Sequence, residues 1–123
     1  MRGIVKIIIL EDSKVMSTIE EKILKSKGYN VEIYHSPEHV MDAIERVQPQ
    51  LFISDINLQE GTAIDVIREV ARSGMTKVLV STAVQTPYTI DSLKRVGVEG
   101  IIIKPFKSED FLQKVDEIIG INI

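Results

Sequence analysis

The stretch Ile7-Ile8-Ile9-Leu10-Glu11-Asp12-Ser13 sets four large apolar side chains directly before two carboxylates. A strand with one solvent-exposed face alternates apolar and polar residues, whereas a strand covered by helices on both faces is apolar throughout. The stretch therefore predicts a buried strand of a parallel sheet that ends at Glu11 and Asp12. Its apolar run is too short to span a bilayer, so we interpret it as a strand and not as a signal peptide.

Five apolar blocks of strand length, rich in β-branched residues, recur along the chain. They span Ile4 to Leu10, Val31 to Tyr34, Leu51 to Ser54, Lys77 to Ser81 and Gly100 to Ile103. Segments with helical spacing separate the blocks, and this strict alternation predicts a doubly wound α/β sheet with right-handed crossovers. Sheets of this kind carry their sites at the carboxyl ends of the strands.

Start and stop signals bound five expected helices. Ser13 can cap the first helix and Gly28 can end it. Along this helix an apolar stripe recurs every fourth residue at Val15, Ile19 and Ile23, beside Met16 and Leu24. The other four helices are expected from Ser36-Pro37 to before Pro49, from Thr62 to Gly74, from Thr86-Pro87 to near Gly97, and from Ser108 to Gly120.

Composition narrows the class of protein. A length of 123 residues predicts one domain over residues 1–123 with no separate effector domain. A net charge of −3 gives no electrostatic reason to bind nucleic acid or an anionic membrane, so we expect protein partners and small ligands. The chain has no cysteine, which excludes disulfides and thiolate sites and agrees with a cytoplasmic location.

The residues that follow the expected strands form a chemically coherent set: Glu11-Asp12, Asp55, Ser81-Thr82 and Lys104-Pro105. Crowded carboxylates repel one another, and a hard divalent cation with oxygen ligands, best Mg²⁺, relieves that repulsion. A carboxylate can also attack phosphorus to give an aspartyl-phosphate, with a lysine and a hydroxyl holding phosphoryl oxygens. Each residue alone is a common loop or cap residue, so the prediction depends on their joint placement.

Four motifs together resemble the receiver domain of two-component response regulators, in particular the stand-alone, chemotaxis-regulator-like type. The resemblance covers essentially the whole chain and implies a flavodoxin-like fold of five parallel strands in the order 2-1-3-4-5 with five helices. The motifs are Ile7 to Ser13, Ser54 to Leu58 followed by Gly61, Val78 to Ala83, and Gly100 to Phe106.

The resemblance also implies a role for each strand-end residue. Asp55 is the expected phosphoacceptor and one of the expected Mg²⁺ ligands. The expected donor is a sensor histidine kinase or a histidine phosphotransfer protein that docks beside the first helix. A downstream protein target would read the phosphorylated state. Asp12 would bind Mg²⁺ directly, Glu11 would act through a metal-bound water, and Asn57 would contribute its main-chain carbonyl. Thr82 and Lys104 would contact phosphoryl oxygens. A cis peptide is expected between Lys104 and Pro105.

Four residues depart from the pattern of the family. Glu11 stands for the commoner Asp, Gln59 for a frequent Pro, and Ala63 for the usual Gly, so the loop after Asp55 is expected to differ. Ile101 replaces an aromatic residue that turns inward in the family, and an aliphatic side chain cannot report the switch through ring rotation. Separately, Val84 is apolar and cannot orient an attacking water, which predicts slow self-dephosphorylation.

Three other functions stay open at this stage. The departures motivate a pseudo-receiver that acts as an unphosphorylated interaction module. A small phosphatase with Asp55 as nucleophile is disfavoured because such enzymes usually carry the nucleophile on the first strand, and a flavin-binding protein lacks its phosphate loop here. His35 and His39 show no acid partner or ligand spacing, so we expect no function for them.

Overall fold

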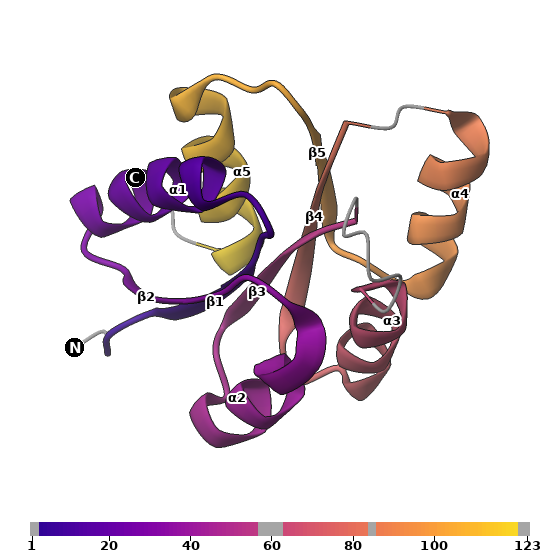
Figure 1. Ribbon diagram of the computed structural model, residues 1–123, viewed down its shortest axis with the longest axis horizontal. Coiled ribbons are helices and arrows are strands. Elements are labelled where there is room, and N and C mark those ends of the chain that lie inside the picture. The colour runs from indigo at the N-terminus through magenta and orange to yellow at the C-terminus, as the bar shows by residue number, and fades with distance from the viewer. Residues whose placement is uncertain (1–2, 57–62, 84–85, 121–123) are drawn as a thin grey trace.

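The computed structural model describes residues 3–56, 63–83 and 86–120. Its five strands form one parallel sheet in the order β2-β1-β3-β4-β5, which confirms the predicted fold (Figure 1). The strands are β1 (Lys6–Leu10), β2 (Asn30–Tyr34), β3 (Leu51–Asp55), β4 (Lys77–Thr82) and β5 (Gly100–Ile103). The helices are α1 (Lys14–Ser26), α2 (Val40–Val47), α3 (Ala63–Ser73), α4 (Pro87–Val96) and α5 (Ser108–Ile119), and a 3₁₀ turn (Pro37–His39) precedes α2.

The helices cover both faces of the sheet, so the core has two layers. α1 and α5 lie on one face, and α2, α3 and α4 lie on the other (Figure 1). Side chains of a strand alternate between the faces: Ile7 and Ile9 enter the α1/α5 layer, while Ile8 and Leu10 enter the α2/α3/α4 layer. All four are at most 1% exposed, which explains the unbroken apolar run at the start of the sequence.

Three strands extend one residue further than the sequence predicts, and one of them, β2, does so at its start, at Asn30. β3 includes Asp55 and β4 includes Thr82, so the sheet itself fixes the backbone of both residues. β1 begins at Lys6 and not at Ile4, whose side chain is exposed.

The expected helix signals are found where the structure describes them. Ser13 Oγ accepts a hydrogen bond from the Met16 backbone N–H at 3.2 Å, and Thr86 Oγ1 accepts one from Thr89 at 3.3 Å. The second helix differs from prediction: the 3₁₀ turn at Pro37 comes first, with the Val40 N–H bonded to the Pro37 carbonyl, and Ser36 makes no side-chain cap. Thr62, the expected cap of α3, lies outside the described residues.

The predicted core face of α1 is confirmed for Leu24, which is buried, and for Ile23, which packs against the core, but it is wrong for Val15 and Ile19. Val15 is 71% exposed and Ile19 is 42% exposed, while Ser17, Glu20 and Leu24 are buried. The buried residues follow the spacing i, i+3, i+7 of one helical face, so the helix is turned to bury a polar stripe that pattern analysis assigns to solvent. None of the helices within the described ranges is long and apolar enough to cross a membrane.

Candidate functional site

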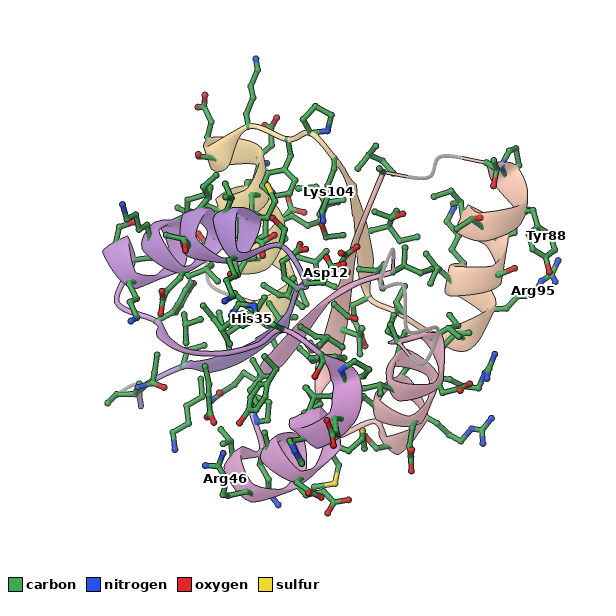
Figure 2. The ribbon with its side chains drawn as sticks, viewed as in Figure 1. Asp12, His35, Arg46, Tyr88, Arg95 and Lys104 are labelled. Atoms are coloured by element: carbon green, nitrogen blue, oxygen red, sulfur yellow. The ribbon has the colours of Figure 1, made fainter. Side chains whose placement is uncertain are left out.

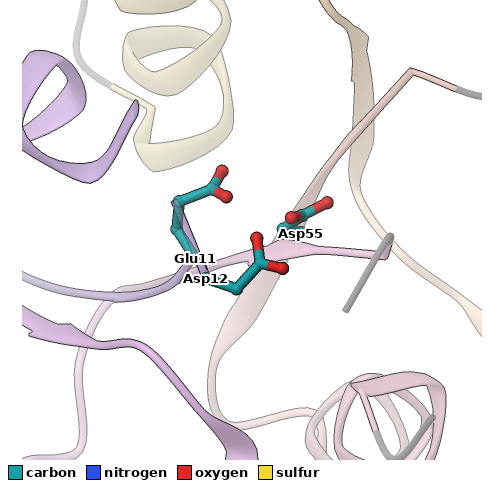
Figure 3. Close-up of side chains that lie close together, drawn as sticks. All are labelled: Glu11, Asp12 and Asp55. Atoms are coloured by element: carbon teal, nitrogen blue, oxygen red, sulfur yellow. The ribbon is translucent and has the colours of Figure 1, made fainter. Parts of the chain in front are cut away.

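Three carboxylates meet at the carboxyl ends of β1 and β3. These strands are neighbours with Leu10 in register with Ser54, so the acids after Leu10 and at the end of β3 reach one edge of the sheet. One oxygen each from Glu11, Asp12 and Asp55 lies within 4.8 Å of the other two (Figure 3). Glu11 and Asp55 are buried and Asp12 is exposed, which leaves this acidic rim open to solvent on one side.

The acidic rim fits a hard divalent cation. Its donors are all oxygens, and carboxylates with room for several waters are the usual environment of Mg²⁺. Asp12 and Asp55 are the acids that the resemblance to receiver domains implies as Mg²⁺ ligands, with Glu11 acting through a metal-bound water. Asn57, whose carbonyl was expected to be another ligand, lies outside the described residues.

Lys104 supplies a cation at the same edge. It follows β5, and its Nζ donates a hydrogen bond to Glu11 Oε1 at 2.7 Å and lies 3.6 Å from Asp55 Oδ1. The Lys104 backbone N–H donates to the Thr82 carbonyl at 2.8 Å, and the expected cis peptide to Pro105 is present. Figure 2 shows Lys104 and Asp12 reaching this edge from different strands of the sheet.

Burial and pairing compete in the Glu11–Lys104 ion pair. Burial raises the pKa of the Glu11 carboxyl to about 7, although the hydrogen bond and charge of Lys104 oppose the rise. For Lys104 burial works against the ammonium, but the hydrogen bond to Glu11 and the charges of Glu11 and Asp55 outweigh it and raise its pKa. Lys104 is therefore held as an ammonium directly beside the acidic rim.

The end of β4 completes the described part of the site. Thr82 is fully buried at the last position of the strand, and its neighbour Ser81 is in register with Asp55. Ile101, which stands for the family's aromatic residue, is partly buried and packs against the α2/α3/α4 layer. Val84 and Gln59 lie outside the described residues.

Sequence analysis missed three contacts or placements. Lys104 forms an ion pair with Glu11, and Glu20 is buried near the rim. His35 Nδ1, 3.0 Å from the Glu11 carbonyl, donates to that oxygen because a carbonyl can only accept. His35 follows β2, the neighbour of β1, so extending the strand-end reading to β2 could have found it; nothing in the pattern pointed to Glu20.

Comparison with known proteins agrees with this geometry. The family model described as the response regulator receiver domain matches residues 7–116. Among solved structures, the Vibrio cholerae chemotaxis protein CheY4 is 23% identical, with a TM-score of 0.86 over 94% of this chain and 99% of that one. A Thermotoga maritima response regulator is 22% identical, with a TM-score of 0.87 over 97% of this chain and 100% of its own.

A third similar structure is the CheY-like receiver domain protein of Methanospirillum hungatei, at 22% identity and a TM-score of 0.89, covering 96% of this chain and 95% of that one. At these identities the solved structures establish the fold. The family model spans most of the chain and includes Asp12, Asp55, Thr82 and Lys104. The chain belongs to the response regulator receiver domain family.

Proposed function

We propose that this receiver domain accepts a phosphoryl group on Asp55 from a phosphohistidine donor, with Mg²⁺ held at the acidic rim, and thereby switches a protein-interaction surface. The observation that carries the proposal is the meeting of three carboxylates with the Lys104 ammonium at one sheet edge. A negatively charged nucleophile beside two cations is the arrangement that phosphoryl transfer requires.

In the proposed reaction an Asp55 carboxylate oxygen bonds to phosphorus while the N–P bond of the phosphohistidine breaks. The leaving imidazole nitrogen keeps the bonding pair and takes up a proton. Asp12, Asp55 and the Asn57 carbonyl would hold the Mg²⁺ ion, with Glu11 acting through a metal-bound water. The ion supplies charge neutralisation at the transferred group.

Lys104 is placed to hold one phosphoryl oxygen. Its ammonium lies 3.6 Å from Asp55 Oδ1, so a short movement away from Glu11 brings it to a phosphoryl oxygen on Asp55. Thr82, at the end of the neighbouring strand, is our candidate for holding a second oxygen through its hydroxyl.

The exposed face of α1 supports docking of the donor beside the site. Val15 and Ile19 lie one helical turn apart and are exposed, directly after the acids at the end of β1. Exposed apolar side chains of this kind commonly mark protein–protein contacts. The donor would be a sensor histidine kinase or a histidine phosphotransfer protein.

Phosphorylation would shift a population between two packings of the surface formed by α4, β5 and α5. The added group brings nearly two negative charges and new acceptor oxygens to the rim. Moving such an equilibrium from mostly off to mostly on takes about 5.5 kcal/mol of differential binding. With Ile101 aliphatic, we propose that the shift is transmitted by packing against the α2/α3/α4 layer.

Phosphate uptake by the Asp55→Asn variant tests the proposal. The parent protein, incubated with a small acyl phosphate and Mg²⁺, should gain the mass of one phosphoryl group, and Asp55→Asn should gain none. Asp65→Asn is the matched control because Asp65 is an exposed acid on α3 that pairs with Arg68 at 3.2 Å and does not belong to the carboxylate cluster of the rim. Equal uptake by Asp55→Asn would contradict the assignment.

A parent protein that gains no phosphoryl mass would favour the pseudo-receiver instead, with the same surface used without phosphorylation. If uptake occurs, the decay of the phosphorylated form in Mg²⁺ buffer tests the slow self-dephosphorylation predicted from Val84. A phosphoryl lifetime of only seconds would contradict that prediction.

A further inference from the structure

Glu20 is a buried carboxylate for which the proposed reaction has no use. It lies in the middle of α1 with 1% of its surface exposed, and neither carboxylate oxygen has a hydrogen-bond partner among the described residues. Glutamate is almost never fully buried unless it is paired, because an unpaired buried charge is costly. An unpartnered carboxyl in a core therefore calls for a specific explanation.

The charged groups that act on Glu20 belong to the acidic rim. Burial is the largest cause of a rise in the pKa of Glu20 to about 8; the charge of Glu11 comes second and that of Asp55 adds to it. The Lys104 ammonium opposes the rise. Glu20 makes no hydrogen bond to any of these three groups, so their charges act on its carboxyl only through electrostatic interaction across space.

The helix packed against α1, α5, offers Glu20 no counter-charge among its described residues. α5 carries the buried acid Asp116, which accepts a hydrogen bond from the Tyr29 hydroxyl and lies 3.5 Å from Lys27 Nζ. Both partners follow the C-terminal end of α1, away from the rim. The Ser81 hydroxyl, on a strand of the same sheet, likewise has no hydrogen-bond partner among the residues the structure describes.

Carboxyl groups outnumber ammonium groups at the rim and at Glu20. The rim and Glu20 together hold four carboxyl groups, Glu11, Asp12, Asp55 and Glu20, against the one ammonium of Lys104. A proton on Glu20, which is buried and has no hydrogen-bond partner among the described residues, reduces this excess at the lowest cost in free energy. A divalent cation at the rim would reduce it in another way and remove the need for that proton.

We propose that Glu20 is an inner proton-binding site of the acidic centre, which holds a proton while the rim is free of cation and releases it when a divalent cation binds. The O–H bond of the Glu20 carboxyl breaks, the proton passes to water, and the carboxylate stays as a fourth negative charge behind the bound ion. The inference rests on the proposed cation binding and is independent of phosphoryl transfer.

Calorimetric titration with Mg²⁺ alone tests this exchange. The parent protein and Glu20→Gln, which keeps the shape and removes the ionisable group, are titrated at pH 7 in two buffers of different ionisation enthalpy to count released protons. The parent should release up to about one more proton per ion than Glu20→Gln, and its affinity should rise more steeply with pH, by up to about tenfold per pH unit. Protons that other groups of the site release are counted in both proteins, so the difference between the two belongs to Glu20.

Glu21→Gln is the matched control, since Glu21 is the next residue of α1 and forms a solvent-side ion pair with Lys25 at 2.9 Å. It should release as many protons as the parent protein. Equal proton release by Glu20→Gln and the parent would overturn the inference while leaving the metal site intact. Absence of Mg²⁺ binding in the parent would overturn the inference and the metal step of the proposed function together.

A direct measurement covers the case in which Glu20→Gln does not fold. Carbon-13 NMR of the side-chain carboxyls in the parent protein follows Glu20 itself through a pH titration, with and without Mg²⁺. The expected midpoint without Mg²⁺ is near 8, falling when the ion is added. A Glu20 midpoint at the ordinary value of 4.5 in the ion-free protein would overturn the inference without any reference to phosphorylation.

Discussion

The two core layers differ in how they treat charge. Among the described residues, four carboxyl side chains are buried: Glu20 and Asp116 lie on the helices of the α1/α5 layer, and Glu11 and Asp55 lie at the carboxyl ends of β1 and β3. The α2/α3/α4 layer contains no buried ionisable side chain in the same described ranges. One layer is built for packing, whereas the other keeps an unpaired carboxyl beside the functional site.

This difference indicates where stability gives way to function. Proteins that depart from local rules tend to do so at functional sites, where the cost is offset by packing elsewhere. Here the departure is Glu20 under the acidic rim, and the offset is the apolar layer on the far side of the sheet. Substitutions in the apolar layer should therefore lower stability at every pH, and substitutions at Glu20 should change how stability depends on pH.

The largest effect is expected for Phe52→Ala in the apolar layer. Phe52 is the second residue of β3 and is fully buried, so its truncation removes a large apolar surface and leaves a cavity. We expect a loss of about 3–5 kcal/mol in the free energy of unfolding, measured by urea denaturation. The loss should be the same at pH 5 and pH 9; a clear pH dependence would break the comparison between the layers.

Glu20→Leu should raise the free energy of unfolding, where Phe52→Ala lowers it, and the size of the change should depend strongly on pH. The folded-state pKa of Glu20 is about 8 against an ordinary 4.5, so the folded protein binds this proton more tightly than the unfolded chain does. The parent protein is therefore most stable below about pH 4.5 with respect to this group, and loses that stability as pH rises through about 8.

Replacing the carboxyl with leucine removes this pH-dependent loss. We expect Glu20→Leu to exceed the parent by about 3 kcal/mol at pH 9 and by much less at pH 5, with relaxation around the buried charge limiting the gain. Urea denaturation at both pH values measures the difference. A variant that is less stable than the parent at pH 9 would mean that Glu20 has a strong partner in the folded protein.

The sequence predicts the rim well because the rim follows from periodicity. Unbroken apolar runs identify strands covered on both faces, and parallel strands bring their carboxyl ends to one edge, so Asp12, Asp55, Thr82 and Lys104 could be named before their positions were known. The ends of the strands were less well predicted: Asp55 and Thr82 belong to the strands because neighbouring strands pair with them or with the residues beside them.

The sequence fails where packing decides between two helical faces. Val15 and Ile19 form a regular apolar stripe, yet α1 buries Ser17 and Glu20 and exposes that stripe. Pattern analysis assigns a glutamate to solvent, because only the fit of a whole helix against the sheet can bury it. The pairing of Lys104 with Glu11 is likewise a property of the folded site, since 93 positions separate them in the chain.

Tyr29→Phe tests whether the second buried acid of the α1/α5 layer is a structural group. The Tyr29 hydroxyl donates to Asp116 Oδ1, and its removal leaves that buried oxygen without one donor. We expect a loss of about 1–2 kcal/mol, measured by thermal or urea unfolding. Tyr34→Phe is the control: its hydroxyl bonds the partly exposed Glu32 at 2.6 Å, and we expect a change within about 0.5 kcal/mol.

Ser81→Ala should have the smallest effect and stabilise the protein by about 1 kcal/mol, since it removes a buried hydroxyl that has no described partner. Ser54→Ala is its counterpart on the other face of the sheet: Ser54 follows Phe52 by two positions on β3, and its hydroxyl donates to the Asp55 carbonyl at 3.4 Å. Ser54→Ala should be neutral or destabilising in the same urea titration. If both variants lose stability alike, the Ser81 hydroxyl must be satisfied by buried water, and water would then also be the natural partner of the unpaired Glu20 oxygens.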